Sequence, residues 1–484
     1  MKVESVVPLL EEDELVSSVL GKRIGKKEFS FSSVATDSRN VKGGSLFVPI
    51  VGEVQDGHIY IRSAVEKGAT VVLAVEENWN ALPDADKDFA SNNACIVFVK
   101  DTIHAFQAAA AAYVRKFPNL IKIGITGSNG KTTTKEIAAA IFSQKYKVIA
   151  TEGNFNSETG LPISVFNIRK EHEVGIFEMG MNRVDEIGEL ASVLCPSFAI
   201  ITNIGTAHIG ILGSKDNIAE EKKKIFSKFK DDSCVGFVPA SDEYASFLAD
   251  VPVGTVRRFG ITEQKNITDV HFDGIEGTSF KYCGVPVKFP LSGEYNFSNM
   301  LAVVALAETL SVPADAVRKG IESVKPLFGR SRVLRGSFVI VQDCYNANAE
   351  SMAESIRFYG GSASSSVGGK KIFVLGDMLE LGDASAETHA KTGELAASEK
   401  PYAVFFVGKE MAKAYEAARA YCEKNGLDVR LFSEPDTSDA AVQGVTDKVL
   451  SLVSDGDLVL VKGSRGLRLE RVASVLCEKA GVAI

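Results

Sequence analysis

The chain has 484 residues, of which 45% are apolar and 24% charged, and its formal net charge is −8. This length exceeds what one hydrophobic core usually serves and predicts two to four domains of a globular protein. The negative charge argues against a general nucleic-acid binder, because binding phosphates along a strand needs a basic surface. No run of 18 apolar residues occurs, so we expect no membrane span. Seven dispersed cysteines without a CxxC pair favour reduced thiols and a cytoplasmic protein.

Residues 1–100 form a first region in which short apolar runs alternate with helical segments. Strands are predicted at 45–51, 69–74 and 94–99. A helix over 101–117 follows, because Pro118 is a stop signal just beyond it. The pattern predicts a mixed α/β module over residues 1–100.

The second region, residues 101–329, repeats an order of apolar strand, polar turn and helix. Its strands are predicted at 121–126, 174–178 and 198–202, with helices near 132–144 and 184–194. This alternation is typical of a parallel sheet that is covered on both faces. A stretch interrupted by glycine and proline at 254–293 resembles hairpins, and a helix near 296–310 follows it.

The third region, residues 330–484, repeats the α/β alternation. Strands are predicted at 338–342, 371–375, 402–407 and 457–461, with helical stretches between them. We expect a second, doubly wound α/β domain here.

The segment 124–133, with the sequence GITGSNGKTT, follows an apolar strand and opens a helix. Glycines allow backbone N–H groups to turn toward phosphate oxygens, Lys131 supplies a cation, and the Thr132 hydroxyl can reach Mg²⁺. The spacing departs from the strict phosphate-loop pattern, because Ile125 occupies the first glycine position. The strand–loop–helix order still favours a nucleotide site over an incidental turn. The expected nucleotide-binding residues of the loop are Gly127, Ser128, Asn129, Gly130, Lys131, Thr132 and Thr133.

Two more polar residues end neighbouring strands. Glu178 closes the strand 174–178, and His208 lies in the loop after the strand 198–202. Ligands of open parallel sheets bind beyond the carboxyl ends of the strands, so both side chains are candidates to hold Mg²⁺ beside the phosphate loop.

The predicted helix around 218–229 carries an oddly placed lysine. Ile218, Ile225, Phe226 and Phe229 mark its apolar stripe, and Lys222 falls within that stripe. The charged run 220–224 is otherwise typical of a solvated face, which fits the neighbouring lysines at 223 and 224. Lys222 therefore either extends its amine to solvent or has an interior role.

With these motifs the chain resembles the Mur ligases of bacterial peptidoglycan synthesis over nearly its whole length. The segments that carry the resemblance are 36–39, 56–58, 124–133, 151–162, 202–214, 343–348, 374–382 and 461–466. The last three are similar to those of the member that adds D-alanyl-D-alanine. Tyr295 stands where this family usually has histidine, Lys224 where glutamate is common, and Ala349 where proline is frequent.

The resemblance implies a nucleotide-sugar-peptide module, a phosphate-loop ATPase core with a parallel sheet, and a Rossmann-like C-terminal domain. It implies ATP and Mg²⁺ as cofactors, and UDP-N-acetylmuramoyl-tripeptide and D-alanyl-D-alanine as substrates of a cytoplasmic, monomeric ligase that forms an acyl phosphate. Catalytic roles would fall to Lys131, His208 and Lys222, the last carbamylated, and metal binding to Thr132, Glu178, His208 and Lys222. The remaining nucleotide-binding residues would be Asn296, Asn299, Arg330 and Asp343. The remaining substrate-binding residues would be Thr36, Ser38, Arg39, Asn154, Asn156, Asn346, Asn348 and Ser464.

Two other interpretations stay open at this point. One is a related ligase that adds a different amino acid or acts on folate, which the uridine-type first region and the C-terminal signatures disfavour. The other is a nucleotide-gated binding protein without catalysis. Intact residues at 131, 132, 178, 208 and 222 argue against it.

Overall fold

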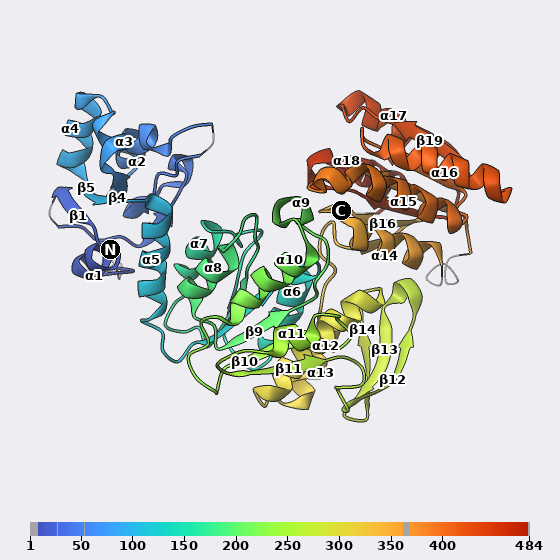
Figure 1. Ribbon diagram of the computed structural model, residues 1–484, viewed down its shortest axis with the longest axis horizontal. Coiled ribbons are helices and arrows are strands. Elements are labelled where there is room, and N and C mark those ends of the chain that lie inside the picture. The colour runs from blue at the N-terminus through green and yellow to red at the C-terminus, as the bar shows by residue number, and fades with distance from the viewer. Residues whose placement is uncertain (1–7, 27, 53, 362–367, 483–484) are drawn as a thin grey trace.

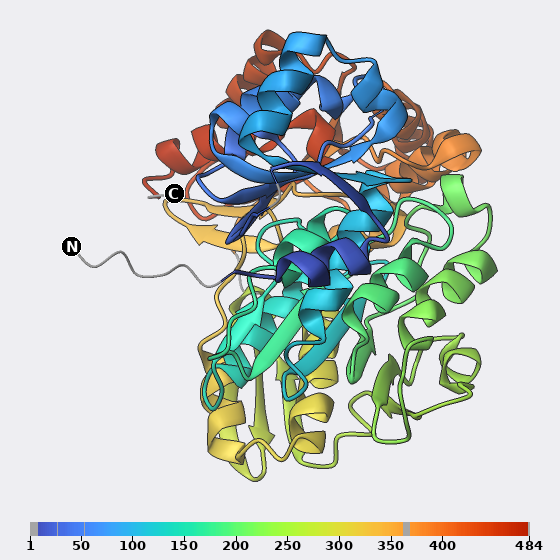
Figure 2. The ribbon, with the colours of Figure 1, turned by 90° about the vertical axis from the view of Figure 1, so that its left-hand side faces the viewer.

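The computed structural model describes residues 8–26, 28–52, 54–361 and 368–482. Figure 1 shows three groups of elements, with the first and the third above opposite ends of the second. In the view turned by 90°, the first group lies in front of the third, and both stay on the same side of the middle one (Figure 2).

The first group is a five-stranded sheet in the order β1-β5-β4-β3-β2, in which only the β1–β5 pair is antiparallel. Helices α2 and α4 share an apolar core with one face of the sheet, whereas the other face packs toward α1 and α5. The elements are α1 (Glu12–Ser18), β1 (Lys22–Gly25), β2 (Ser33–Ala35), η1 (Ser38–Asn40), β3 (Ser45–Phe47), η2 (Gly57–Tyr60), α2 (Ile61–Glu66), β4 (Ala69–Val75), α3 (Glu76–Asn80), α4 (Asp84–Asn93) and β5 (Cys95–Val99).

Helix α5 (Thr102–Val114) connects the first group to the second. Its N-terminus is capped by Asp101, whose side chain accepts the His104 N–H at 2.7 Å. The helix contacts β4 on one side and α7 and α8 on the other, so one apolar core continues through both groups.

The second group contains a six-stranded, fully parallel sheet in the order β11-β10-β9-β6-β8-β7. Helices α6, α12 and α13 share a core with one face, and α7, α8 and α10 belong to the core on the other face. The elements are β6 (Ile121–Thr126), α6 (Lys131–Phe142), β7 (Val148–Ala150), α7 (Gly160–Val165), β8 (Val174–Glu178), α8 (Glu186–Leu194), β9 (Phe198–Ile201), α9 (Ile209–Leu212), α10 (Lys215–Lys223), η3 (Lys224–Phe226), β10 (Val235–Pro239), α11 (Ala245–Ala249), β11 (Thr255–Phe259), β12 (Ile267–Phe272), η4 (Gly274–Glu276), β13 (Thr278–Tyr282), β14 (Val285–Phe289), α12 (Glu294–Thr309) and α13 (Ala314–Glu322).

Two predictions for this group need correction. The helix predicted around 218–229 ends at Lys223 and tightens into the 3₁₀ turn η3. The segment 254–293 is only in part a set of hairpins: β11 joins the parallel sheet beside β10, and β12, β13 and β14 form a separate antiparallel sheet. Strand β11 is short and mostly exposed, and its apolar and polar residues alternate as in a hairpin strand. The sequence alone does not show that its partner strand is parallel.

The third group is a six-stranded sheet in the order β15-β16-β20-β17-β18-β19, parallel except for β15. Helices α14, α15 and α16 cover one face, and α17 and α18 the other. The elements are β15 (Arg332–Arg335), β16 (Val339–Asp343), α14 (Ala349–Gly360), β17 (Lys371–Gly376), η6 (Gly382–Ala384), α15 (Ser385–Ser398), β18 (Ala403–Val407), α16 (Met411–Asn425), β19 (Arg430–Glu434), α17 (Asp439–Leu452), β20 (Leu458–Lys462), η7 (Arg465–Leu467) and α18 (Glu470–Lys479).

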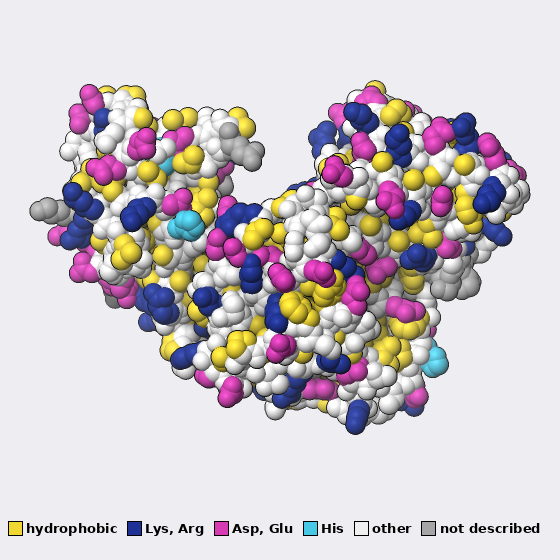
Figure 3. All heavy atoms as spheres, in the orientation of Figure 1, with side chains coloured by type: hydrophobic (Ala, Val, Ile, Leu, Met, Phe, Trp, Pro, Cys, Tyr) yellow, Lys and Arg dark blue, Asp and Glu magenta, His cyan; other side chains and the backbone are white. Residues whose placement is uncertain are grey.

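The predicted fold class is confirmed: the chain is α/β, with several mostly parallel sheets. None of the described helices combines the length and the apolar character that a bilayer crossing requires. In the space-filling view a wide hollow separates the first group from the third, and its floor is the second group (Figure 3).

Candidate functional site

Two glycines shape the phosphate loop between β6 and α6. Gly127 has a φ of 152° and Gly130 one of 79°. An added Cβ would lie 1.8 Å from the Thr202 hydroxyl at the first position, and 2.5 Å from the Asn299 side-chain oxygen at the second. Neither position has room for a side chain, and glycine therefore allows the loop to lie close to the end of β9 and to α12. Helix α6 begins directly after the loop. A helix N-terminus after such a loop is an anion site.

The residues after β9 hold the phosphate loop in place. The N–H of Ser128 donates to the backbone oxygen of Asn203 at 3.1 Å, and the N–H of Asn129 donates to the Asn203 side-chain oxygen at 2.9 Å. Lys131 turns back onto its own loop, with Nζ 2.8 Å from the Gly127 oxygen. Burial lowers the pKa of Lys131, and the nearby Glu178 carboxylate opposes that shift.

Glu178 brings carboxylate oxygens to the edge of the sheet. It is 2% exposed, and its two oxygens accept hydrogen bonds from the Thr132 hydroxyl at 2.8 Å and from the Asn156 amide at 2.7 Å. Among the described residues no three His, Cys, Asp or Glu side chains form a metal-binding cluster. The Thr132 and Glu178 oxygens are hard donors that fit Mg²⁺, which keeps several ligands from water and substrate phosphates.

Lys222 on α10 has its side chain in the interior, at 1% exposure. The contact that its Nζ makes is with the sulfur of Met181, at 3.8 Å. Burial holds the pKa of Lys222 well below its usual range, and the positive charge of Lys131 lowers it further. The side chain therefore does not extend to solvent, and it presents a buried amine under the Met181 loop.

Glu221, next to Lys222, is also buried, and the sequence interpretation did not predict this. It is 2% exposed and accepts the N–H groups of Asp185 and Ile187, each at 2.9 Å, at the start of α8. Lys224 donates to Glu221 at 2.7 Å and also pairs with Asp185. Glu221 lies three positions after Ile218 and four before the apolar Ile225, so the helical spacing carried a signal for its burial.

His208, at the start of α9, contacts a residue of the third group. Its Nδ1 lies 3.2 Å from the Glu380 Oε2, within ion-pair distance but without the alignment of a hydrogen bond. His208 lowers the pKa of Glu380, and the more distant Lys131 adds to this shift. The contact is possible because a Cβ on Gly210 would already lie 3.0 Å from the backbone oxygen of Glu380.

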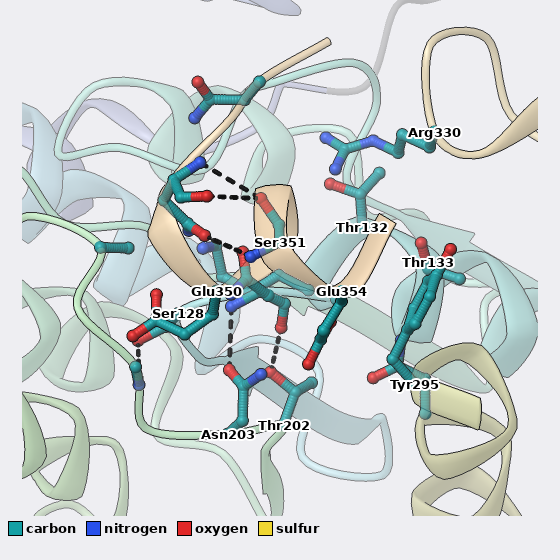
Figure 4. Close-up of a pocket in the computed structure, with 18 of the residues that line it drawn as sticks. Ser128, Thr132, Thr133, Thr202, Asn203, Tyr295, Arg330, Glu350, Ser351 and Glu354 are labelled. Carbon is teal, nitrogen blue, oxygen red and sulfur yellow. Dashed lines mark hydrogen bonds between the residues drawn. The ribbon is translucent and has the colours of Figure 1, made fainter. Parts of the chain in front are cut away.

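Helix α14 is attached to the phosphate loop through its first turn. Glu350 accepts the N–H and the hydroxyl of Thr206, both at 2.8 Å, and Asn348 donates to the Asn129 side-chain oxygen at 2.7 Å. Figure 4 shows Glu350 over Ser128, with Thr202 and Asn203 beneath. Asn348 also caps α14. Sequence reasoning missed Glu350, because nothing local links it to a loop 144 residues earlier.

At one end of the cavity lie an aromatic and an amide side chain from the start of α12, Tyr295 and Asn296. Tyr295 donates to or accepts from Ser331 at 2.7 Å, and burial raises its pKa well above the usual range. Asn296 donates to the Ser292 oxygen at 2.8 Å. Ile261 and Phe272 also line the cavity, and 48% and 42% of these side chains are exposed. Exposed apolar side chains on a cavity wall fit a flat ring.

Asp343 lies at the junction of the second and third groups. Its two oxygens accept from the Ser331 N–H at 3.0 Å, from the Ser355 hydroxyl at 2.8 Å and from Lys462 Nζ at 2.7 Å. Both oxygens of Asp343 are thus engaged by residues of the third group or just before it. Arg330, one residue before Ser331, lies over a tyrosine ring and is close enough to Lys131 to lower its pKa.

The predicted residues at the C-terminal loops have local partners. Asn346 accepts the next N–H of the chain at 2.9 Å. Ser464 is 2% exposed, and its hydroxyl accepts the Leu379 N–H at 3.0 Å. Its position, at the end of β20 beside the end of β17, brings two loops of the third sheet together.

A cavity of about 1560 Å³ unites these parts. The predicted site residues that line it are Ser128, Asn129, Gly130, Lys131, Thr132, Thr133, Asn154, Asn156, Glu178, His208, Asn296, Asn299, Arg330, Asp343, Asn346, Asn348 and Ser464. Gly127 and Lys222 are not in this lining: Gly127 accepts a hydrogen bond from Lys131 within the loop, and Lys222 contacts Met181, which is itself in the lining.

Thr36, Ser38 and Arg39 lie apart from the cavity lining, in the first group. The side chain of Asp37 caps η1 and holds the Arg39 guanidinium at 2.6 Å, which lowers the pKa of Asp37 to about 2. The Arg39 side chain is nonetheless 84% exposed. It is therefore an exposed cation that a ligand can reach.

Comparisons with known proteins agree with this architecture. Three domain families match: Mur ligase family, catalytic domain over residues 30–114, Mur ligase middle domain over 125–307, and Mur ligase, glutamate ligase domain over 329–465. The chain is 43% identical to a UDP-N-acetylmuramoyl-tripeptide–D-alanyl-D-alanine ligase of Treponema pallidum, covering 97% of this chain and 99% of that one. It is 33% identical to the protein of that name from Bacillus subtilis, covering 92% and 93%.

Solved structures show the same fold. A crystal structure of MurF from Acinetobacter baumannii aligns with a TM-score of 0.84 at 27% identity and covers 98% of this chain and all of that one. MurF ligase from Thermotoga maritima in complex with ADP aligns with a TM-score of 0.76 at 26% identity, with 93% and 98% covered.

Proposed function

The chain belongs to the Mur ligase family, and on that basis we propose that it joins D-alanyl-D-alanine to UDP-N-acetylmuramoyl-tripeptide with ATP as the phosphoryl donor. One observation carries this proposal: the phosphate loop and the loops at the carboxyl ends of β16, β17 and β20 line a single cavity. An activated carboxylate and an incoming amine can meet there. The product belongs to peptidoglycan precursor synthesis.

The reaction has two charge-building steps. The terminal carboxylate of the tripeptide attacks the γ-phosphorus of ATP and forms an acyl phosphate, and ADP leaves. The amine of the dipeptide then attacks the acyl carbon, loses a proton and displaces inorganic phosphate. The Lys131 ammonium group would stabilise the charge of the transferred phosphoryl group, and the N–H groups at the start of α6 would stabilise the neighbouring oxygens.

The site residues fit a magnesium ion, because the Thr132 hydroxyl and the Glu178 carboxylate are already in contact and both are oxygen donors. We propose that Thr132, Glu178, His208 and a carbamylated Lys222 hold it. When bound, Mg²⁺ neutralises charge on the phosphoryl oxygens. Asn156 orients Glu178 through its amide.

The buried amine of Lys222 supports its carbamylation. An uncharged amine is the form that adds to CO₂, which gives a carbamate and releases one proton. Lys222 is buried and lies in the field of Lys131, and both effects favour that uncharged form. A carbamate is an anion, so the modification replaces a cation that would repel Mg²⁺ by an oxygen ligand.

Nucleotide binding falls to the phosphate loop and to the junction of the second and third groups. We propose that adenine lies between the exposed faces of Ile261 and Phe272, near Asn296 and Asn299, with Tyr295 in the place of the usual histidine. Arg330 and Asp343 would approach the nucleotide from the junction. We propose that Asn154, Asn346, Asn348 and Ser464, which line the cavity, contact the peptide substrates.

The nucleotide-sugar end of the substrate is proposed to bind the first domain. Thr36, Ser38 and Arg39 belong to it, and we divide the chain at residues 1–100, 101–329 and 330–484. The first and third parts each contain one sheet, and the second contains two. Since one chain supplies all walls of the cavity, we propose a monomer. Because it would need ATP, we propose that it acts in the cytoplasm.

Arg39→Ala should raise the KM for the UDP-linked substrate about 10-fold or more, because a charged hydrogen bond to that ligand is lost. The KM for ATP should stay near the wild-type value, since the residue lies outside the cavity lining. Steady-state kinetics with each substrate varied in turn measure this. Arg62→Ala removes another partly exposed arginine of the first domain and serves as the control. An effect confined to ATP would show that the first domain has another role.

Phosphate release tests the proposed function directly. The purified chain should release phosphate from ATP only when UDP-N-acetylmuramoyl-tripeptide and D-alanyl-D-alanine are both present, and mass spectrometry should find the extended peptide. Alternative tripeptides in the same assay identify the third residue. Phosphate release that ignores the dipeptide, or nucleotide binding without turnover, would instead favour a different ligase or a non-catalytic binding protein.

A further inference from the structure

A second lysine of α6 lies one turn after Lys131 and is buried. Lys135 is 2% exposed, and its Nζ donates to the backbone oxygen of Thr151 at 2.6 Å. The same amine pairs at 2.7 Å with Glu136, whose side chain is 38% exposed. Burying a charged amine costs free energy unless the amine is paired and hydrogen-bonded. An apolar side chain could fill the same interior space without that cost, so the contact with Thr151 calls for an explanation.

Thr151 connects this lysine to the strand end that carries Glu178. The Thr151 hydroxyl accepts the Glu178 backbone N–H at 3.0 Å, and the Thr151 N–H donates to the Ile176 oxygen at 2.9 Å. Thr151 is 1% exposed, so water does not compete for these contacts. Lys135 and Glu178 therefore hold the same residue from two sides, one through its backbone oxygen and the other through its hydroxyl.

Further contacts close a ring around the Glu178 carboxylate. Thr132, three positions before Lys135 on α6, donates to one carboxylate oxygen at 2.8 Å. Asn156, five positions after Thr151, donates to the other oxygen at 2.7 Å. Residues at helix positions i and i+3 lie on the same face, so α6 attaches to β8 and to the segment after β7 at two neighbouring points. The ring consists of α6, that segment and the end of β8.

The segment between β7 and α7, residues 151–159, contains neither helix nor strand. The four residues that follow Thr151 are exposed. Segments with few buried contacts open easily. At its far end Asn156 accepts the Gly180 N–H at 2.8 Å, and at its start Lys135 is the cation that holds Thr151. The course of the segment therefore depends on an attachment at each end.

We propose that Lys135 is a positioning residue for the magnesium site, and that it acts through Thr151 to hold the Glu178 carboxylate beside the Thr132 hydroxyl. The inference rests on the proposed function and deepens it. Groups that orient the ligands of a metal without touching the metal still affect its affinity, and their loss typically weakens binding about 10- to 100-fold. Lys135 thus sets how tightly the metal binds beside the nucleotide, whereas the phosphate loop sets how tightly the nucleotide itself binds.

The role of Lys135 is tested by the affinity for ADP with and without the metal. Calorimetry on the full chain, once with Mg²⁺ and once with EDTA in its place, gives the factor by which Mg²⁺ tightens ADP binding. In Lys135→Met this factor should fall about 10-fold, or to one where the wild-type factor is smaller. The Kd for ADP in EDTA should keep its wild-type value, because Lys131 and the N–H groups at the start of α6 are unchanged.

Two results of this measurement would overturn the role of Lys135. One is a magnesium factor in Lys135→Met that equals the wild-type factor. The other is a loss of ADP affinity that is equally large with and without Mg²⁺, since that would mean that Lys135 supports the phosphate loop as such. A wild-type Kd in EDTA also shows that the variant is folded.

Two further variants separate the hydrogen bond to Thr151 from the ion pair and from a folding defect. Glu136→Gln removes the ion pair and leaves the bond from Lys135 to Thr151, so it should keep the wild-type magnesium factor. Thr151→Val keeps Lys135 and removes the hydroxyl that accepts the Glu178 N–H, so it should lose much of the factor even if Lys135→Met does not fold. A Glu136→Gln chain that behaves like Lys135→Met, or a Thr151→Val chain with the wild-type factor, contradicts the ring of contacts.

The wild-type chain separates the two levels of inference. If it binds ADP equally well with and without Mg²⁺, the magnesium site of the proposed function fails, and the role of Lys135 fails with it. If the wild type shows the magnesium effect and Lys135→Met keeps all of it, the magnesium site stands and only the role of Lys135 is wrong. In turnover, the Mg²⁺ concentration that gives half of the maximal phosphate release should rise about 10-fold in Lys135→Met, and kcat at saturating Mg²⁺ should approach the wild-type value.

Discussion

Lys131→Ala should abolish phosphate release that depends on D-alanyl-D-alanine, with kcat at least about 100-fold lower. Lys131 is the cation at the end of the phosphate loop: its Nζ lies 2.8 Å from the Gly127 oxygen and can exchange this contact for one with a phosphate oxygen. The charge that builds on the transferred phosphoryl group would lose its nearest protein cation. Alanine keeps the helical backbone of α6, so the loss should be one of chemistry and not of folding.

A matched control lies at the other end of the same helix. Lys145 follows α6, contacts the Ser311 oxygen and lies over the Tyr146 ring, far along the helix from the loop. Lys145→Ala should retain activity, and both variants should melt close to the wild type. Wild-type turnover by Lys131→Ala would remove the phosphate loop from the reaction.

Lys222→Ala should be nearly inactive, and formate or acetate should restore part of its activity. The substitution deletes a fully buried side chain and leaves a cavity behind Met181. A small carboxylate can enter that space and supply the oxygen ligand that a carbamate provides. Activity should be measured as a function of added carboxylate, with chloride at equal ionic strength for comparison.

Carbamylation also has a spectroscopic test that does not need turnover. With carbon-13 bicarbonate, the wild-type chain should show a carbamate resonance that Lys222→Ala lacks. Lys223→Ala is the control, because its neighbouring amine lies over the Phe247 ring and outside the cavity lining. Full activity of Lys222→Ala without any additive would refute the carbamate.

Much of the local structure could be predicted because it depends on short-range patterns. The strands at 121–126 and 174–178 were predicted with their observed bounds, since a fully buried parallel strand is a continuous apolar run between turns. The helix predicted over 101–117 is observed as α5 over Thr102–Val114: Asp101 caps its start, and its end lies three residues earlier than Pro118 suggested. The predicted strands did not include β1, β2, β7, β10, β15 and β19. All of these except β10 are sheet edges with exposed or half-buried residues, which weakens the apolar pattern.

The sequence by itself determined the phosphate loop, the edge of the sheet that carries Glu178 and His208, and the helix face of Lys222, because each follows from a motif or a period within one element. It also carried the resemblance to the Mur ligases. Only the tertiary structure decided which groups face one another between domains. Glu350 on Thr206, Glu380 on His208 and Arg465 on Tyr345 are contacts between residues far apart in the chain. No local pattern encodes them, because they arise only when two sheets with separate cores pack along one cavity.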